Sequence, residues 1–270
     1  MNDYSLLLNY HLRKDLAMIH IKKEFIENIS LLHVFQAKQA EQPLPTVIYY
    51  HGFYGEKESS LTLAYKIAMK GFRVLLPDSL FHGERQEDMT KIELDLAFWD
   101  IVLQNVKELA MIKDYLEKNK LTIPGRIGLG GTSMGGITTF GALRKYEWIK
   151  AAAVLMGTPK MIAYAHLLID EFNRVNDQQI SETERAEVIE RLSAFDLSKE
   201  PEKLNNRPLF IWHGVEDQVV PFQHSQSFYE NINHLYDHQE HLLFFKEKGR
   251  AHHISRLSIA KAANWFERFM

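Results

Sequence analysis

The expected fold of this chain follows from one stretch of its sequence, Gly130-Gly131-Thr132-Ser133-Met134-Gly135-Gly136. An apolar run typical of a strand precedes it at residues 126–130, and a helical pattern follows from Met134 to Leu143. The motif Gly131-x-Ser133-x-Gly135 at such a junction predicts a tight turn with its serine at positive φ, because glycine leaves room on both sides. We therefore expect Ser133 to project as a nucleophile. The Met134 N–H is expected to be unpaired at the helix N-terminus, where it could donate to an oxyanion.

Strand and helix patterns alternate along the chain on both sides of this turn. Alternation requires crossover connections, which join parallel neighbours, so the sequence predicts an α/β fold with a mostly parallel central sheet and helices on both faces. The expected strands are an antiparallel pair within Leu16–Phe35, then Thr46–Tyr50, Phe72–Leu76, Arg126–Gly130 after a Pro124-Gly125 turn, Ala151–Met156, Pro208–Trp212 and Leu242–Phe245. One helix is expected after a Ser59 or Ser60 cap, and another starts at a Thr90–Glu93 capping box and continues to Leu116. Further helices are expected from Met134 and after Pro221, and a closing helix ends at Phe269.

The alternation stops between residues 158 and 202. Two amphipathic helices are expected there, Met161–Phe172 and Ser181–Leu192, the second with a capping box formed by Ser181 and Glu184. We interpret this segment as a small helical cap inserted into a core made of residues 1–157 and 203–270. The apolar side chains of the first helix could line an acyl pocket, although packing against the core would produce the same pattern.

Composition excludes several classes of function. The net charge is −3 and the isoelectric point about 6.5, so no positive field favours nucleic acid or an anionic membrane as a partner. The absence of cysteine removes disulfides, thiolate metal sites and cysteine nucleophiles. No export signal and no apolar run long enough to span a membrane is visible, so we expect a cytoplasmic protein. A homo-oligomer is compatible with this sequence.

A serine nucleophile needs a base within hydrogen-bond reach and an acid that orients the base. The order of strands places the candidate acid in the loop after Pro208–Trp212, within His213-Gly214-Val215-Glu216-Asp217, at the carboxyl end of the sheet. Asp217 is the preferred acid and Glu216 its competitor. A helix-capping turn residue is the structural alternative for Asp217.

The candidate base lies between the last strand and the last helix. His252 and His253 both fall in this loop, and either could reach Ser133 from there. His252 is preferred, and a turn histidine remains the structural alternative. A second oxyanion donor is expected from the loop after Thr46–Tyr50, where Gly52 permits close backbone approach and the Phe53 N–H is the candidate.

These motifs together resemble the α/β-hydrolases, and among them the bacterial esterases similar to dienelactone hydrolase and prolyl oligopeptidase. The resemblance spans roughly residues 45–266 and depends on four motifs in the expected order. They are His51-Gly52-Phe53, Gly131-Thr132-Ser133-Met134-Gly135-Gly136, His213-Gly214-x-x-Asp217-x-x-Val220-Pro221, and His252 followed by a helix. The resemblance implies hydrolysis of carboxylic esters of small or medium acyl groups through an acyl-serine, with no cofactor or metal. It also favours Asp217 over Glu216 and His252 over His253.

Three other interpretations remain open at this stage. A serine peptidase or a thioesterase would use the same triad, and a hydrolase-like fold could bind a small molecule without catalysis. A metal site would need His234, His238 and His241 with Asp237 on one helix, but this segment is expected to pass from helix to strand. The loop Asp78–Arg85 resembles one beside the active-site mouth of these esterases, and we expect Arg85 to pair there with a nearby acid.

Overall fold

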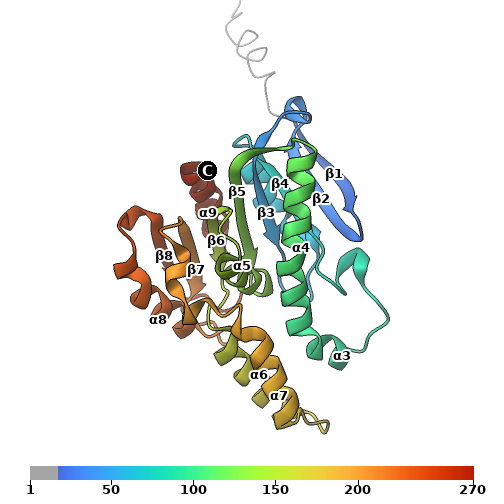
Figure 1. Ribbon diagram of the computed structural model, residues 1–270, viewed down its shortest axis with the longest axis vertical. Coiled ribbons are helices and arrows are strands. Elements are labelled where there is room, and N and C mark those ends of the chain that lie inside the picture. The colour runs from blue at the N-terminus through green and yellow to red at the C-terminus, as the bar shows by residue number, and fades with distance from the viewer. Residues whose placement is uncertain (1–17) are drawn as a thin grey trace, which may run out of the picture.

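The computed structural model describes residues 18–270, and its centre is an eight-stranded sheet (Figure 1). The strand order is β1-β2-β4-β3-β5-β6-β7-β8, in which β1, β2 and β4 pair antiparallel and all later neighbours pair parallel. The strands are β1 Ile19–Ile26, β2 Ile29–Gln36, β3 Leu44–Tyr50, β4 Arg73–Pro77, β5 Thr122–Thr132, β6 Ile149–Leu155, β7 Leu209–Gly214 and β8 Leu242–Glu247. This confirms the predicted mostly parallel sheet and, from Ile19 onward, the opening antiparallel pair; the first two residues of its predicted range lie outside the described part.

Helices cover both faces of the sheet, as the alternating pattern predicted. In β3, Val47 and Tyr49 pack with one apolar cluster that contains α2 and α9, whereas Ile48 and Tyr50 pack with another that contains α4, α5 and α8. Successive strand residues point to opposite faces, so a strand with apolar residues throughout is buried on both sides. The helices are α2 Leu61–Ala68, α3 Lys91–Leu96, α4 Phe98–Lys118, α5 Met134–Lys145, α6 Met161–Val175, α7 Glu182–Ser193, α8 Phe222–Ile232 and α9 Arg256–Phe269.

Three local predictions were wrong. The predicted long helix is two helices, α3 and α4, which meet at Ala97. Strand β5 begins at Thr122, because Leu44 of β3 pairs with Thr122 and the Pro124-Gly125 segment forms an irregularity inside the strand, where Gly125 has φ +72°. Ser60 makes no side-chain cap for α2, since the chain enters that helix through a 3₁₀ turn, Lys57–Ser60, rather than in the extended conformation that a cap residue adopts.

The predicted capping boxes begin α3 and α7. Thr90 accepts a hydrogen bond from the Glu93 N–H, Ser181 accepts one from the Glu184 N–H, and each glutamate reaches back to its cap residue. Both capping-box predictions are therefore confirmed.

Further short 3₁₀ turns lie at Ala37–Gln39, Gly83–Arg85, Leu197–Lys199, Pro201–Leu204, Asn233–Leu235 and Gln239–His241.

Helices α6 and α7 lie side by side at one end of the sheet, at the bottom of Figure 1. A third apolar cluster joins them to α4 and α5, with Met161 and Tyr164 from α6 and Leu192 from α7 fully or almost fully buried. The two predicted helices of segment 158–202 are thus confirmed, while its role as a cap stays a prediction. Within residues 18–270, no helix has the length and apolar character needed to cross a membrane.

Candidate active site

Ser133 lies at the tight turn between β5 and α5. Its φ is +54° and ψ −113°, a conformation that a residue with a side chain adopts only when the surroundings enforce it. The Ser133 N–H donates to the Leu155 carbonyl at 2.9 Å, which holds the turn against β6. A Cβ on Gly131 would lie 2.2 Å from the carbonyl of Gly135, and a Cβ on Gly135 would lie 2.2 Å from the Tyr50 oxygen. The turn therefore requires glycine at both positions, as predicted.

The structure brings Ser133, His252 and Asp217 into one hydrogen-bonded chain. Ser133 Oγ lies 2.8 Å from His252 Nε2, and His252 Nδ1 lies 2.7 Å from Asp217 Oδ2. The Asp217 carboxylate can only accept, so the imidazole proton is on Nδ1 and the free Nε2 accepts from the Ser133 hydroxyl. This is the arrangement in which a base can take the proton of a serine hydroxyl.

The Asp217 carboxylate is buried and fully hydrogen-bonded. Oδ1 accepts from the N–H groups of Val219 and Val220, at 2.9 and 3.0 Å, and Oδ2 accepts from His252 and from His213 Nε2, the latter at 3.1 Å. Burial alone raises the pKa of Asp217, but the hydrogen bonds and charges of the two histidines lower it by more, so the pKa lies well below its ordinary range. The site thus holds an ionised carboxylate against the base.

The alternatives to Asp217 and His252 lie elsewhere. Glu216 Oε1 accepts from the Gly249 N–H at 3.1 Å, which ties its side chain to the neighbouring loop. His253 is exposed, and within residues 18–270 its ring makes no hydrogen bond; its N–H donates to the Ala251 carbonyl. Of the two candidate acids and two candidate bases, the structure therefore joins one acid and one base to Ser133.

The two predicted oxyanion donors have free N–H groups. Within the described part of the chain, neither the Phe53 N–H nor the Met134 N–H takes part in a hydrogen bond. Both belong to backbone beside the nucleophile: Met134 follows it, and a Cβ placed on Gly52 would lie 3.5 Å from the Ser133 Cβ. Unpaired N–H groups beside a nucleophile can stabilise the negative charge that develops on a carbonyl oxygen.

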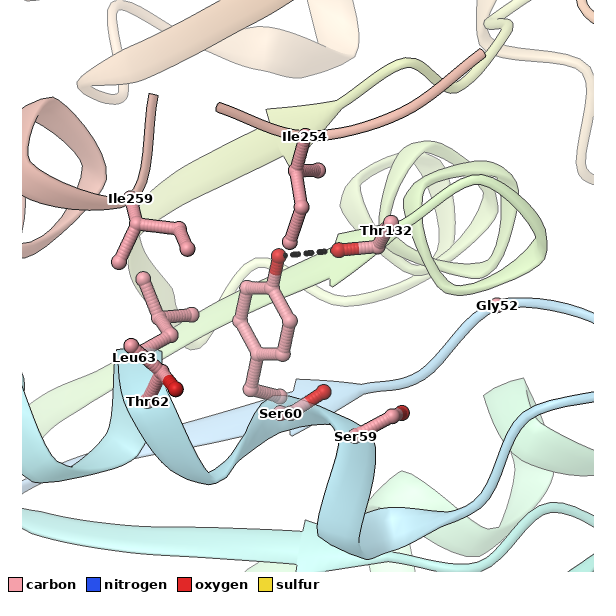
Figure 2. A pocket seen from close by; sticks show the side chains of 9 residues that line it. Gly52, Ser59, Ser60, Thr62, Leu63, Thr132, Ile254 and Ile259 are labelled. Carbon is pink, nitrogen blue, oxygen red and sulfur yellow. Dashed lines mark hydrogen bonds between the residues drawn. The ribbon is translucent and has the colours of Figure 1, made fainter. Parts of the chain in front are cut away.

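A cavity of about 130 Å³ is lined by Gly52 and by Thr132, the residue that precedes the nucleophile (Figure 2). Gly52 and Thr132 form one side of the cavity, and Leu63 and Ile259 lie across from them. The Thr132 hydroxyl is 2.6 Å from that of Tyr49. The cavity is also lined by Ser59, Ser60, Thr62 and Ile254. Its walls are mainly apolar, with hydroxyl groups at the positions of serine and threonine.

Sequence reasoning missed three histidines near this site, namely His51, His82 and His213. His51 and His213 lie inside the quoted motifs. Neither spacing nor composition distinguishes a histidine that contacts a backbone amide, as His51 does, or the carboxylate of Asp217, as His213 does, from an ordinary core histidine. Their hydrogen bonds join segments far apart in the sequence, and those of His51 and His82 are described below.

Two of the residues considered for a metal site, His241 and Asp237, have hydrogen-bond partners outside that set. Helix α8 ends at Ile232, as expected, and His241 Nδ1 lies 3.1 Å from the Asn206 carbonyl, while Asp237 Oδ2 accepts from the Asn206 side chain. Among residues 18–270, no three His, Cys, Asp or Glu side chains are grouped so that they could hold a metal ion.

Comparisons with known proteins identify the family of this chain. Residues 103–270 match the prolyl oligopeptidase family. The chain is 42% identical over 258 residues to a Bacillus subtilis protein named "Putative esterase YitV", covering 94% of this chain and all of that protein. It is 30% identical over 211 residues to the esterase YjfP of Escherichia coli, covering 77% and 82% of the two chains.

A solved structure shows the same fold. The crystal structure of TT1662 from Thermus thermophilus superposes with a TM-score of 0.73 at 20% identity, covering 93% of this chain and 98% of that one. The chain therefore belongs to the prolyl oligopeptidase family, as a serine hydrolase of the α/β-hydrolase fold.

Proposed function

We propose that this hydrolase cleaves carboxylic esters of small or medium acyl groups with Ser133 as nucleophile, His252 as general base and Asp217 as the acid that orients the base. The observation that carries the proposal is the unbroken chain of hydrogen bonds from Ser133 Oγ through His252 to Asp217, at 2.8 and 2.7 Å. A hydroxyl held this way loses its proton to the imidazole as it attacks, whereas an isolated serine hydroxyl is a weak nucleophile.

The reaction then proceeds in two halves. Ser133 Oγ attacks the ester carbonyl while His252 takes its proton, and the same imidazole gives that proton to the departing alcohol, which leaves an acyl-serine. Water, deprotonated by His252, releases the acid and restores the serine. The Phe53 and Met134 N–H groups would stabilise both tetrahedral oxyanions, and losing one such donor typically costs about 2.7–4 kcal/mol of transition-state stabilisation. No cofactor takes part.

The cavity lined by Gly52 and Thr132 is our candidate for the acyl-binding pocket, which favours substrates at the smaller end of the range. Its volume of about 130 Å³ is close to that of an apolar cavity of about 150 Å³ that can hold benzene. A substituent of roughly six heavy atoms would therefore fill it. Whether the apolar side chains of α6 also contact an acyl chain stays a prediction.

A serine peptidase is the second candidate, because the matched family is that of prolyl oligopeptidase. The triad does not distinguish an ester from an amide, since both pass through the same acyl-serine. A thioesterase and a non-catalytic binding protein remain less favoured alternatives. A cytoplasmic location remains a prediction from the sequence. A small-molecule ester as the partner remains a prediction from the motifs and the family resemblance, and homo-oligomerisation stays open.

The test is hydrolysis of p-nitrophenyl acetate, butyrate and octanoate, with peptide p-nitroanilides measured in parallel. Ser133→Ala and His252→Ala should each lower kcat by about 10³-fold or more, while the matched control His253→Ala should stay close to the wild-type rate. Activity that is indifferent to Ser133→Ala would exclude the mechanism. Cleavage of the anilides with higher kcat/KM than the esters would instead favour the peptidase.

A further inference from the structure

The loop after β3, which carries Phe53, lies against the loop after β4. Strands β3 and β4 are parallel neighbours, so the two loops leave the same edge of the sheet. Lys57 Nζ lies 2.6 Å from Asp78 Oδ2 and the Lys57 N–H donates to Asp78 Oδ1 at 2.9 Å, with both side chains almost completely buried. Arg85 anchors the second loop through a bidentate pair with Glu108, at 2.6 and 2.8 Å, which confirms the acid partner predicted for it.

One histidine fixes the peptide unit that carries the Phe53 N–H. His51 Nδ1 lies 2.8 Å from the Gly52 carbonyl oxygen, which also accepts from the Gly55 N–H at 3.0 Å. In a trans peptide the C=O and N–H point in opposite directions within one plane, so holding the Gly52 carbonyl sets the direction of the Phe53 N–H. His51 itself is held from the second loop, because its Nε2 accepts from the Ser79 N–H at 3.0 Å.

A second histidine fixes the next peptide unit. The Tyr54 N–H donates to His82 Nε2 at 3.1 Å, and His82 Nδ1 donates to the Leu80 carbonyl at 2.8 Å. Tyr54 has a φ of +60°, a left-handed conformation that costs a non-glycine residue roughly 1–2 kcal/mol. The hydrogen bond from His82, which lies outside the turn, offsets part of this cost. The imidazole rings of His51 and His82 are both buried, and their centroids are 5.3 Å apart.

We propose that His82, together with His51, is a positioning residue that holds the Phe53 N–H toward the oxyanion of the reacting carbonyl. The inference rests on the proposed function, because it gives the Asp78–Arg85 loop a role in that reaction. The two histidines hydrogen-bond to the peptide groups on either side of the Phe53 Cα. His51 contacts the Gly52 carbonyl from the first loop, and His82 contacts the Tyr54 N–H from the second. A donor oriented in advance stabilises the transition state without reorganising, and this raises kcat more than it tightens substrate binding.

Two substitutions at His82 separate this role from simple packing. In His82→Asn, the amide nitrogen can replace Nδ1 and keep the bond to Leu80, but nothing replaces Nε2 as the acceptor for Tyr54. In His82→Gln, the longer side chain places a carbonyl oxygen near the position of Nε2. The matched control is His241→Asn, since His241 also contacts a backbone carbonyl but precedes the amino end of β8, at the opposite edge of the sheet.

For His82→Asn we expect kcat on p-nitrophenyl acetate to fall by about 10- to 100-fold with KM nearly unchanged. Removing a whole oxyanion donor typically lowers kcat by about 10²–10³-fold, and this variant keeps the Phe53 N–H but orients it less well, so its loss should be smaller. His82→Gln should recover most of the loss, and His241→Asn should match the wild type. The Tm of each variant shows whether it is folded at the assay temperature.

A second readout needs no turnover. An alkyl trifluoromethyl ketone adds to a serine hydroxyl and places an oxyanion between the donors, so its Ki, measured by protection of Ser133 from a fluorophosphonate probe, should rise for His82→Asn in proportion to the loss of kcat. A rate close to wild type, or a lower kcat with an unchanged ketone Ki, would overturn the positioning role. If the wild type binds the ketone but hydrolyses no ester, the proposed function fails, and the ketone Ki still decides the role of His82.

Discussion

His213 Nε2 lies 3.1 Å from Oδ2 of Asp217, the same carboxylate oxygen that accepts from the base. His213 is completely buried, its Nε2 is also 3.0 Å from the Val220 carbonyl, and its Nδ1 is 2.9 Å from the Ser225 hydroxyl. Both partners of Nε2 are acceptors, so this nitrogen carries a proton and donates. Asp217 is therefore held between two imidazoles, one that faces the nucleophile and one that faces the core.

Replacing His213 with leucine should weaken both the fold and the site. The substitution removes one donor from a buried carboxylate and leaves the Val220 carbonyl without this donor, whereas Ser225 keeps its hydrogen bond to the Gly157 carbonyl. We therefore expect a loss of about 1–3 kcal/mol in the free energy of unfolding. Because the carboxylate would then be less well oriented, kcat should fall about tenfold. Urea unfolding and ester kinetics measure the two effects. Wild-type values for both would contradict this account, and His253→Leu is the control.

Asp217→Asn should be more severe than any change at Glu216. An amide can donate its N–H to His252 Nδ1 and so favour the tautomer with the proton on Nε2, which cannot accept from Ser133; a loss of about 10⁴-fold in kcat is expected. Glu216→Gln should stay within a few-fold of the wild type, because among residues 18–270 the Glu216 side chain hydrogen-bonds to the Gly249 N–H and not to His252. Initial rates with p-nitrophenyl acetate decide the assignment, and the reverse ranking would identify Glu216 as the acid.

The stability of the protein should fall as the pH drops from about 6.5 to about 4. Burial lowers the pKa of His33 and of His51 to about 4, from an ordinary value of 6.5. Between these values the unfolded chain binds protons that the native protein excludes, so each histidine removes about 1.4 kcal/mol of unfolding free energy per pH unit. Urea titrations at several pH values test this, with His33→Gln expected to reduce the slope. A pH-independent free energy across the window would refute it.

Adding a methyl group at Gly131 should disrupt the turn. The new Cβ would lie 2.2 Å from the backbone of Gly135, which cannot move without displacing α5. We expect Gly131→Ala to cost about 3 kcal/mol or more and to abolish activity. In Gly52→Ala the nearest atoms would be at 3.5 Å, an ordinary contact, so thermal unfolding of this variant should stay near that of the wild type. Equal Tm values for the two variants would show that the turn can relax.

Much of the fold could be predicted because its signals are local. The apolar run of β3 and the capping boxes of α3 and α7 depend on residues a few positions apart, and each was found near its observed place. The start of β5 could not be predicted, since it depends on the pairing of Leu44 with Thr122 across the sheet. The division of α3 from α4 at Ala97 has no signal of its own, because alanine is a good helix former.

By itself, the sequence determined the turn around Ser133 and the loops that supply an acid and a base, because the turn needs glycine within two residues and the loops follow from the order of the strands. The sequence preferred Asp217 to Glu216 and His252 to His253, but only the tertiary structure shows that His252 contacts Ser133 and that Asp217 contacts His252. Neighbouring loop residues point in different directions that no spacing encodes. The tertiary structure also brought His213 to the acid and His82 to the loop of Phe53. Those contacts depend on how distant strands align at one edge of the sheet, a property of the packed molecule and not of any short segment.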